Sequence, residues 1–146
     1  MRILVVDDDE STRMVVRMGL AGMEVFEAAD GPAALHLLAD EEIDLVLLDI
    51  MLPRMSGMEV LEQVRSDERI AAVPIVMLTC QRTEYSHFTA YYSGADGYVT
   101  KPFDPLALEA VILGVLARSP DERRAVRAQQ QDLAGVLDHI EHSFGA

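Results

Sequence analysis

The sequence predicts an α/β domain in which helices cover both faces of a doubly wound, five-stranded parallel sheet. Two observations predict this class: short apolar runs recur along the chain, and segments with helical spacing separate them. A strand that is apolar on both faces is typical of a parallel sheet buried on both sides. The expected strands are the runs at residues 3–6, 25–28, 45–48, 75–78 and 98–100.

Each strand is followed by a segment whose apolar residues fall on one helical face. Two of these helices have a clear start, because a capping Asp precedes Pro at residues 30–32 and 104–105. In chain order, the expected faces are Thr12, Val15, Val16 and Leu20; Ala34, Leu35, Leu38 and Ala39; Met58, Leu61 and Val64; Phe88 and Tyr92; and Leu108, Val111, Ile112 and Val115.

The pattern changes after Ala117. Residues 119–122, Ser-Pro-Asp-Glu, predict a new helix, since a capping hydroxyl is followed by Pro and by acids that the helix dipole favours. Val126, Leu133 and Ile140 recur every seven residues, which indicates one long amphipathic helix. We therefore divide the chain into a domain at 1–118 and a C-terminal helix at 119–146. This helix would pair two copies, pack on its own domain or lead to a further domain.

Composition excludes several classes of function. The 146 residues contain 25 Asp and Glu against 12 Lys and Arg, a formal charge of −13, which argues against direct nucleic-acid binding or binding to an anionic membrane. A single Cys, Cys80, excludes an internal disulfide and fits a reducing cytoplasm. No apolar run is long enough for a signal peptide or a membrane span.

Polar residues gather where the expected strands end. The first strand runs into four acids at residues 7–10, the third ends in Asp49, the fourth in Thr79 and the fifth in Lys101. Ligands of an open parallel sheet bind at the carboxyl ends of its strands, so these groups would meet on one rim. Clustered carboxylates suit Mg²⁺, and a carboxylate, Mg²⁺ and a Lys together suit phosphoryl transfer. Lys101 is the only Lys among twelve basic residues. The compact charge of a Lys and the planar guanidinium of an Arg are not interchangeable, so a Lys at this position favours phosphate chemistry.

Four motifs in order resemble the receiver domain of two-component response regulators over residues 1–118. They are Ile-Leu-Val-Val-Asp-Asp-Asp-Glu at 3–10, Asp-Ile-Met-Leu-Pro-Arg-Met-Ser-Gly at 49–57, Pro-Ile-Val-Met-Leu-Thr at 74–79, and Gly-Ala-Asp-Gly-Tyr-Val-Thr-Lys-Pro-Phe at 94–103. The acid run also admits a pairing of Asp8 with Asp9, but the strand at 3–6 and Arg13 favour Asp7 and Asp8. The resemblance implies a flavodoxin-like sheet with strand order 2-1-3-4-5.

The resemblance also implies roles for individual residues. Asp49 would accept a phosphoryl group from the phosphohistidine of a histidine kinase or phosphotransfer protein. Asp8, Asp49 and the backbone carbonyl of Met51 would bind Mg²⁺, with Asp7 acting mainly through water.

Three further roles follow from the same resemblance. Thr79 would hydrogen-bond the phosphoryl group and Lys101 would pair with it. Tyr98 would turn inward as a switch, and the Lys101–Pro102 peptide bond would be cis.

Six of the eight aromatic residues lie between residues 85 and 103, where the family has its output and dimerisation face. Tyr85 and Tyr91 do not share the inward face with Phe88 and Tyr92, so we expect a partner-binding surface formed by the fourth helix, fifth strand and fifth helix. The expected partners are the kinase, a downstream protein and a second copy of the chain.

We interpret the protein as a cytoplasmic signalling switch, with slow self-catalysed dephosphorylation, rather than a turnover enzyme. The tail at 119–146 is too short for a DNA-binding or catalytic domain, which favours a stand-alone regulator that acts through protein contacts. Two alternatives remain open: a Mg²⁺-dependent phosphohydrolase with an Asp nucleophile, and a pseudo-receiver that acts as a scaffold. The hydrolase is disfavoured because its nucleophile normally follows the first strand and a cap covers its site.

Overall fold

The computed structural model describes residues 1–79 and 94–129. In these ranges the domain alternates strands with helices, as expected, and the fourth predicted helix, around Phe88 and Tyr92, lies outside them. The elements are β1 (Arg2–Val6), α1 (Glu10–Gly19), β2 (Glu24–Ala28), α2 (Gly31–Asp40), β3 (Leu45–Asp49), α3 (Gly57–Ser66), β4 (Ile75–Thr79), β5 (Gly97–Thr100) and α5 (Pro105–Leu116). Each strand begins or ends within one residue of its predicted bounds.

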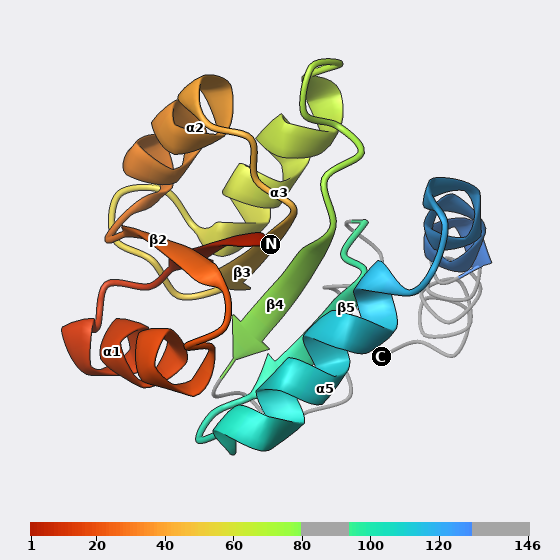
Figure 1. Ribbon diagram of the computed structural model, residues 1–146. Coiled ribbons are helices and arrows are strands. Elements are labelled where there is room, and N and C mark those ends of the chain that lie inside the picture. The colour runs from red at the N-terminus through yellow and green to blue at the C-terminus, as the bar shows by residue number, and fades with distance from the viewer. Residues whose placement is uncertain (80–93, 130–146) are drawn as a thin grey trace, which may run out of the picture.

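The five strands form one parallel sheet in the order β2-β1-β3-β4-β5, which confirms the predicted topology (Figure 1). Parallel pairing places all the carboxyl ends on one edge. Val6 lies opposite Ala28 and Leu48, and Thr79 lies opposite Thr100. The residues that follow or end these strands are therefore neighbours in space.

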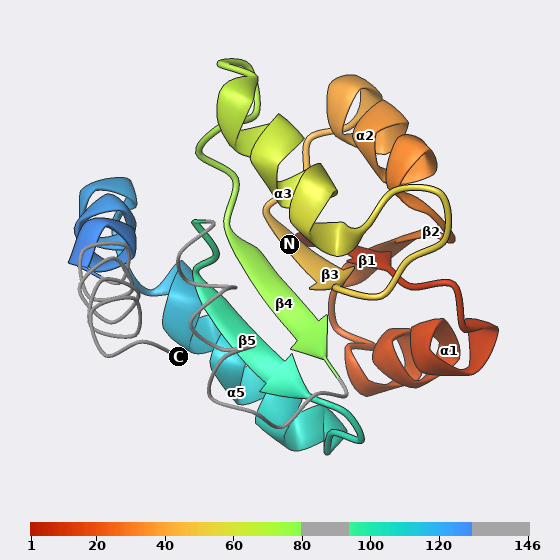
Figure 2. The same ribbon diagram turned by 180° about the vertical axis from the view of Figure 1, so that it is seen from behind.

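Two apolar layers hold helices against the two faces of the sheet. On one face, α2 and α3 pack through residues such as Leu38 and Leu61, and on the other α1 and α5 pack through Val16 and Ile112. Figures 1 and 2 show these two layers from opposite sides. The central strands β3 and β4 are buried along their whole length between the layers, which is why the sequence shows continuous apolar runs there.

The predicted helical faces are right in their centres and wrong at two margins. Val16, Leu20, Ala34 and Leu38 are buried, but Val15 and Ala39 are exposed. A helix that packs on a sheet buries a narrow stripe, so residues at the margin of the apolar face remain outside the core.

A new helical segment, residues 120–129, follows α5, as residues 119–122 predicted. The backbone amide of Glu122 donates to the Ser119 hydroxyl at 3.1 Å, and the Ser119 amide donates to the Glu122 carboxylate at 3.2 Å. This reciprocal pair satisfies amides that a helix start would otherwise leave without partners. Among the residues that the structure describes, no helix has the length and apolar character needed to cross a bilayer.

Candidate functional site

Asp7 leaves the end of β1 and is completely buried. Its backbone amide donates to the Ala28 carbonyl at 3.1 Å, and its own carbonyl accepts from Arg13 Nη1 at 2.7 Å. The Asp9 amide donates to Asp7 Oδ1 at 2.9 Å. The backbone and one carboxylate oxygen of Asp7 are thus fixed, and its other oxygen, Oδ2, faces the site.

Asp9 has a different task from its two neighbours. It is the N-cap of α1, where its carboxylate accepts from the Ser11 amide at 2.9 Å. That hydrogen bond holds the pKa of Asp9 below its usual value. With Asp9 engaged in starting the helix, the acids that approach Asp49 are Asp7 and the exposed Asp8.

Asp49 is the last residue of β3 and is 3% exposed. The Met51 amide donates to Asp49 Oδ1 at 3.0 Å, which fixes the carboxylate at the mouth of the site. Gly57, the first residue of α3, packs directly against the Asp49 backbone and donates its amide to the Ile50 carbonyl at 2.9 Å. A Cβ at position 57 would overlap the Asp49 carbonyl oxygen. The start of α3 therefore depends on glycine there.

Lys101 joins the two buried acids. Its Nζ lies 2.5 Å from Asp7 Oδ2 and 3.1 Å from Asp49 Oδ2, and its backbone amide donates to the Thr79 carbonyl at 2.7 Å. The Lys101–Pro102 peptide bond is cis, as predicted. One ammonium group thus forms ion pairs with two buried carboxylates, Asp7 and Asp49, and does not pair with the third acid, Asp8.

Burial and the neighbouring charges both shift the pKa values of Asp49 and Lys101. Burial, reinforced by the charge of Asp7, raises the pKa of Asp49, although the Met51 amide and Lys101 act in the opposite direction. Burial alone would lower the pKa of Lys101, but its hydrogen bonds and charge interactions with Asp7 and Asp49 raise it instead. The lysine is therefore firmly protonated, and the carboxylates keep an excess of negative charge.

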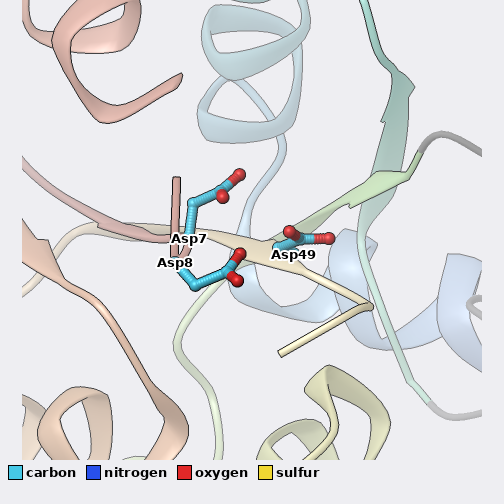
Figure 3. A group of neighbouring side chains, drawn as sticks. All are labelled: Asp7, Asp8 and Asp49. Carbon is cyan, nitrogen blue, oxygen red and sulfur yellow. The ribbon is translucent and has the colours of Figure 1, made fainter. Parts of the chain in front are cut away.

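The acids Asp7, Asp8 and Asp49 each offer one carboxylate oxygen, and these oxygens lie within 4.8 Å of one another. Figure 3 shows the three side chains grouped where β1 and β3 end. A set of oxygen ligands with surplus negative charge is the kind of site that a hard divalent cation occupies. The residues present fit the Mg²⁺ that the sequence predicts.

Thr79 and Tyr98 are the expected switch residues. Thr79 ends β4, is buried and lies opposite Thr100 on β5, next to Lys101. Tyr98 lies opposite Met77 and is half-buried against the apolar layer that contains α2 and α3. Both stand on the strands that lead to the site, and their roles in switching stay predictions.

Sequence reasoning missed two features near the site and predicted others that cannot be placed. Gly57 appeared only as part of a motif, although a glycine at the start of a helix could have indicated close backbone contact. Arg13 helped to choose Asp7 and Asp8 within the acid run, but its hydrogen bond to the Asp7 carbonyl was not predicted. Cys80 and the aromatic residues Tyr85, Phe88, Tyr91 and Tyr92 lie outside the described residues, as do most of the tail's apolar positions.

The sequence is similar to a known protein family and to several regulatory proteins. A family model described as the response regulator receiver domain matches residues 3–113. The alkaline phosphatase synthesis transcriptional regulatory protein PhoP of Bacillus subtilis is 40% identical over 154 residues, which cover 98% of this chain and 63% of PhoP. The DNA-binding dual master transcriptional regulator RpaA of Synechocystis is 35% identical, over 99% of this chain and 61% of RpaA.

Solved structures give the same result. Chemotaxis protein CheY4 of Vibrio cholerae superimposes with a TM-score of 0.74 and 34% identity, over 78% of this chain and 97% of CheY4. A putative response regulator from Chloroflexus aurantiacus gives a TM-score of 0.77 and 33% identity, over 80% of this chain and 98% of that one. Both likenesses cover nearly the whole of the other chain, so the shared part is a complete domain.

One expectation needs correction. The negative charge led us to expect no direct contact with nucleic acid, but the relatives are named as transcriptional regulators, one of them DNA-binding. This chain spans only about half to two thirds of the length of such relatives. Its charge therefore describes the part that is present and does not bear on a longer protein.

The family match covers about three quarters of the chain and includes every residue of the candidate site. It agrees with the strand order of the sheet and with the acids and lysine at its carboxyl edge. Regulators of this family act as phosphorylation switches in two-component systems. The chain belongs to the response regulator receiver domain family.

Proposed function

We propose that Asp49 is the phosphoacceptor of this receiver domain and takes a phosphoryl group from the phosphohistidine of a histidine kinase or phosphotransfer protein. The supporting observation is the buried Asp49 carboxylate, 3.1 Å from Lys101 Nζ and within reach of Asp7 and Asp8. A buried acid with a raised pKa at a rim of fixed charges is typical of a functional group rather than a solvated turn.

In this proposal an Asp49 oxygen attacks phosphorus in line with the bond to the imidazole nitrogen. The new O–P bond forms as the N–P bond breaks, and the bonding electron pair stays on the imidazole nitrogen. Lys101 Nζ donates to a phosphoryl oxygen and neutralises part of its charge. The Met51 amide keeps the carboxylate oriented during attack.

We propose that Asp7, Asp8, Asp49 and the backbone carbonyl of Met51 hold Mg²⁺, with Asp7 acting mainly through water. When bound, the cation supplies the positive charge that offsets the phosphoryl oxygens in the transition state. The three carboxylates supply the charge that such a cation requires, because Lys101 alone leaves them in excess.

We further propose that phosphorylation is read out through Thr79 and Tyr98. Thr79 would bond the new phosphoryl group, and Tyr98, now half-buried against the core, would move further inward and change the face formed by the fourth helix, β5 and α5. That face would bind a downstream protein or a second copy of the chain. The division into a receiver domain at 1–118 and a C-terminal helix at 119–146 is part of the same proposal, as is a cytoplasmic location.

The chain would turn over no separate substrate. Its autophosphorylation and slow dephosphorylation would act on its own Asp49, which distinguishes it from a Mg²⁺-dependent phosphohydrolase. The comparisons do not favour the hydrolase. A pseudo-receiver scaffold would lack one of the acids, the threonine or the lysine, and all of these are present.

The test is phosphorylation by a small acyl phosphate, with Mg²⁺ or with excess chelator, followed by phosphate-affinity electrophoresis and intact mass. We expect a single added phosphoryl group in the wild type with Mg²⁺. We expect none in Asp49→Asn and strongly reduced incorporation in Asp8→Asn. Asp40→Asn is the matched control, because Asp40 is an exposed acid at the end of α2 and should leave incorporation unchanged.

Two outcomes would contradict the proposal. One is phosphorylation that persists in Asp49→Asn, which would place the acceptor elsewhere. The other is an unmodified wild type under conditions in which its unfolding transition shows it to be folded, which would favour the scaffold. Continuous release of inorganic phosphate from a low-molecular-weight ester would instead favour the hydrolase.

A further inference from the structure

A second buried aspartate, Asp96, lies at the opposite end of the sheet from Asp49. It directly precedes β5, and its side chain is 1% exposed. Its amide donates to the Ile75 carbonyl at 2.7 Å, and Asp96 Oδ2 accepts from the Ile75 amide at 2.8 Å. Asp96 therefore ties the start of β5 to the start of β4.

Two arginines share this carboxylate. Arg65, near the end of α3, approaches Asp96 Oδ2 at 3.0 Å, and Arg127, in helical segment 120–129, approaches Oδ1 at 2.5 Å. The Arg127 side chain is only 11% exposed. A guanidinium from beyond α5 is thus buried against a carboxylate of the receiver domain.

The two arginines are held to different degrees. Arg65 also donates to the backbone carbonyls of Gly94, Ala71 and Val73, at 2.9, 2.8 and 2.6 Å, so it belongs to the receiver domain itself. Arg127, by contrast, is held by its ion pair with Asp96. If Arg127 left, Asp96 would keep Arg65 and the Ile75 amide, and no buried charge would remain without a partner.

The docked arrangement has an excess of positive charge. Arg123, four residues before Arg127, contacts the Arg118 carbonyl at 2.5 Å, and its buried Nε has no hydrogen-bond partner among the residues described. Burial is the main cause that lowers the pKa of Arg65 to about 10; Arg127 and Arg123 act in the same direction, and Asp96 acts in the opposite one. One carboxylate therefore balances several guanidiniums, which makes the docked state less favourable than a one-to-one pair.

From this geometry we propose that residues 119–129, here called the strap, dock reversibly on the receiver domain, with Arg127 as the anchoring residue and Asp96 as its receptor. The strap opens as a unit, and the receiver domain stays folded because Arg65 completes the Asp96 pair. Figure 1 shows the strap in blue, beyond the end of α5. The proposal does not depend on the phosphoacceptor role of Asp49, which lies at the other edge of the sheet.

Limited trypsin digestion of the full chain tests the proposal, because cleavage after Arg123 requires an open strap. Arg127→Met removes the anchoring charge and keeps an unbranched apolar side chain. We expect cleavage after Arg123 to become about tenfold faster or more, the scale set by loss of one buried charge-assisted hydrogen bond. Arg69→Met is the matched control, because Arg69 is exposed, pairs with Asp67 outside the strap, and leaves the monitored bond and its flanking residues unchanged.

Two further measurements make the result decisive. Asp49 phosphorylation of Arg127→Met should match that of the wild type. Its receiver domain should keep one cooperative unfolding transition, with a midpoint lowered by no more than the few degrees, about 5 °C, that loss of docking accounts for. Arg127→Lys, which keeps the charge, should restore part of the protection. Cleavage of Arg127→Met at the wild-type rate would show that Arg127 does not anchor the strap. Loss of the receiver's own unfolding transition in Arg127→Met would show that the strap is integral to the domain and does not open independently.

Discussion

Replacing Gly57 with alanine should damage both the stability of the domain and its phosphorylation. An ideal Cβ at this position would overlap the Asp49 carbonyl oxygen and lie 2.8 Å from Ile50 Cα and 2.9 Å from the Asp49 carbonyl carbon. All three are backbone atoms at the end of β3, so no side chain can rotate away to make room. Either α3 or the end of β3 must shift.

The magnitude follows from that rigidity. Extra methyl groups in packed sites cost about 1–3 kcal/mol, and a contact with backbone on both sides belongs at the upper end, about 3 kcal/mol. For a chain of this size, that corresponds to a thermal midpoint lower by roughly 5–10 °C. Movement of Asp49 by a fraction of an ångström should also slow phosphorylation by an acyl phosphate on the order of tenfold to a hundredfold.

Gly114 provides the matched control. It lies in α5, is exposed, and an added Cβ there meets no atom within 4 Å. Gly114→Ala should therefore raise the free energy of unfolding by about 0.5–1 kcal/mol, through helix propensity alone. Urea unfolding followed by circular dichroism measures both variants. If Gly57→Ala is as stable as the wild type, or if both variants change in the same direction, the steric argument is refuted.

Three other predictions concern the acids and the lysine. Because burial raises the pKa of Asp49, the folded state binds its proton more tightly than the unfolded state does. The stability that this proton contributes is lost as pH rises from about 4 through the folded pKa. Without divalent cations, the free energy of unfolding of Asp49→Asn should therefore increase relative to that of the wild type over this rise, and a constant difference in urea titrations would contradict this. Millimolar Mg²⁺ should raise the thermal midpoint of the wild type and should raise that of Asp8→Asn much less. Equal midpoint shifts in the two proteins would argue against a cation at this site. Lys101→Arg keeps the charge, but a guanidinium cannot place one nitrogen between the Asp7 and Asp49 carboxylates at 2.5 and 3.1 Å. Phosphorylation of this variant by an acyl phosphate should therefore be at least about tenfold slower than that of the wild type. An unchanged rate would show that charge alone suffices.

The fold could be predicted almost completely from local patterns. The three central strands, β1, β3 and β4, are buried on both faces, so their apolar runs are continuous and easy to recognise. Asp30 and Asp104 each combine an N-cap with a following proline. The margins of the helices were less predictable. Val15 has the spacing of a core residue, but how wide a stripe a helix buries depends on its tilt against the sheet, which a single helix does not encode.

The sequence predicts which residues form the candidate site, but it does not predict the contacts that hold them in place. Asp7, Asp49 and Lys101 follow strand ends, and parallel pairing alone brings them together. The contacts that hold them come from other elements: Arg13 on the Asp7 carbonyl and Gly57 under the Asp49 backbone. These contacts depend on how the starts of α1 and α3 fold back on the strand ends, and no periodicity or composition marks them in advance.

Asp49 and Asp96 show how one fold gives buried aspartates opposite tasks. Both are almost fully buried and both contact cationic side chains, so burial and pairing do not separate them. The balance of charge does. Asp49 shares a single ammonium with Asp7 and has Asp8 nearby, which leaves negative charge that a cation can neutralise. Asp96 is already paired with two guanidiniums, those of Arg65 and Arg127, so it serves to hold chain segments together.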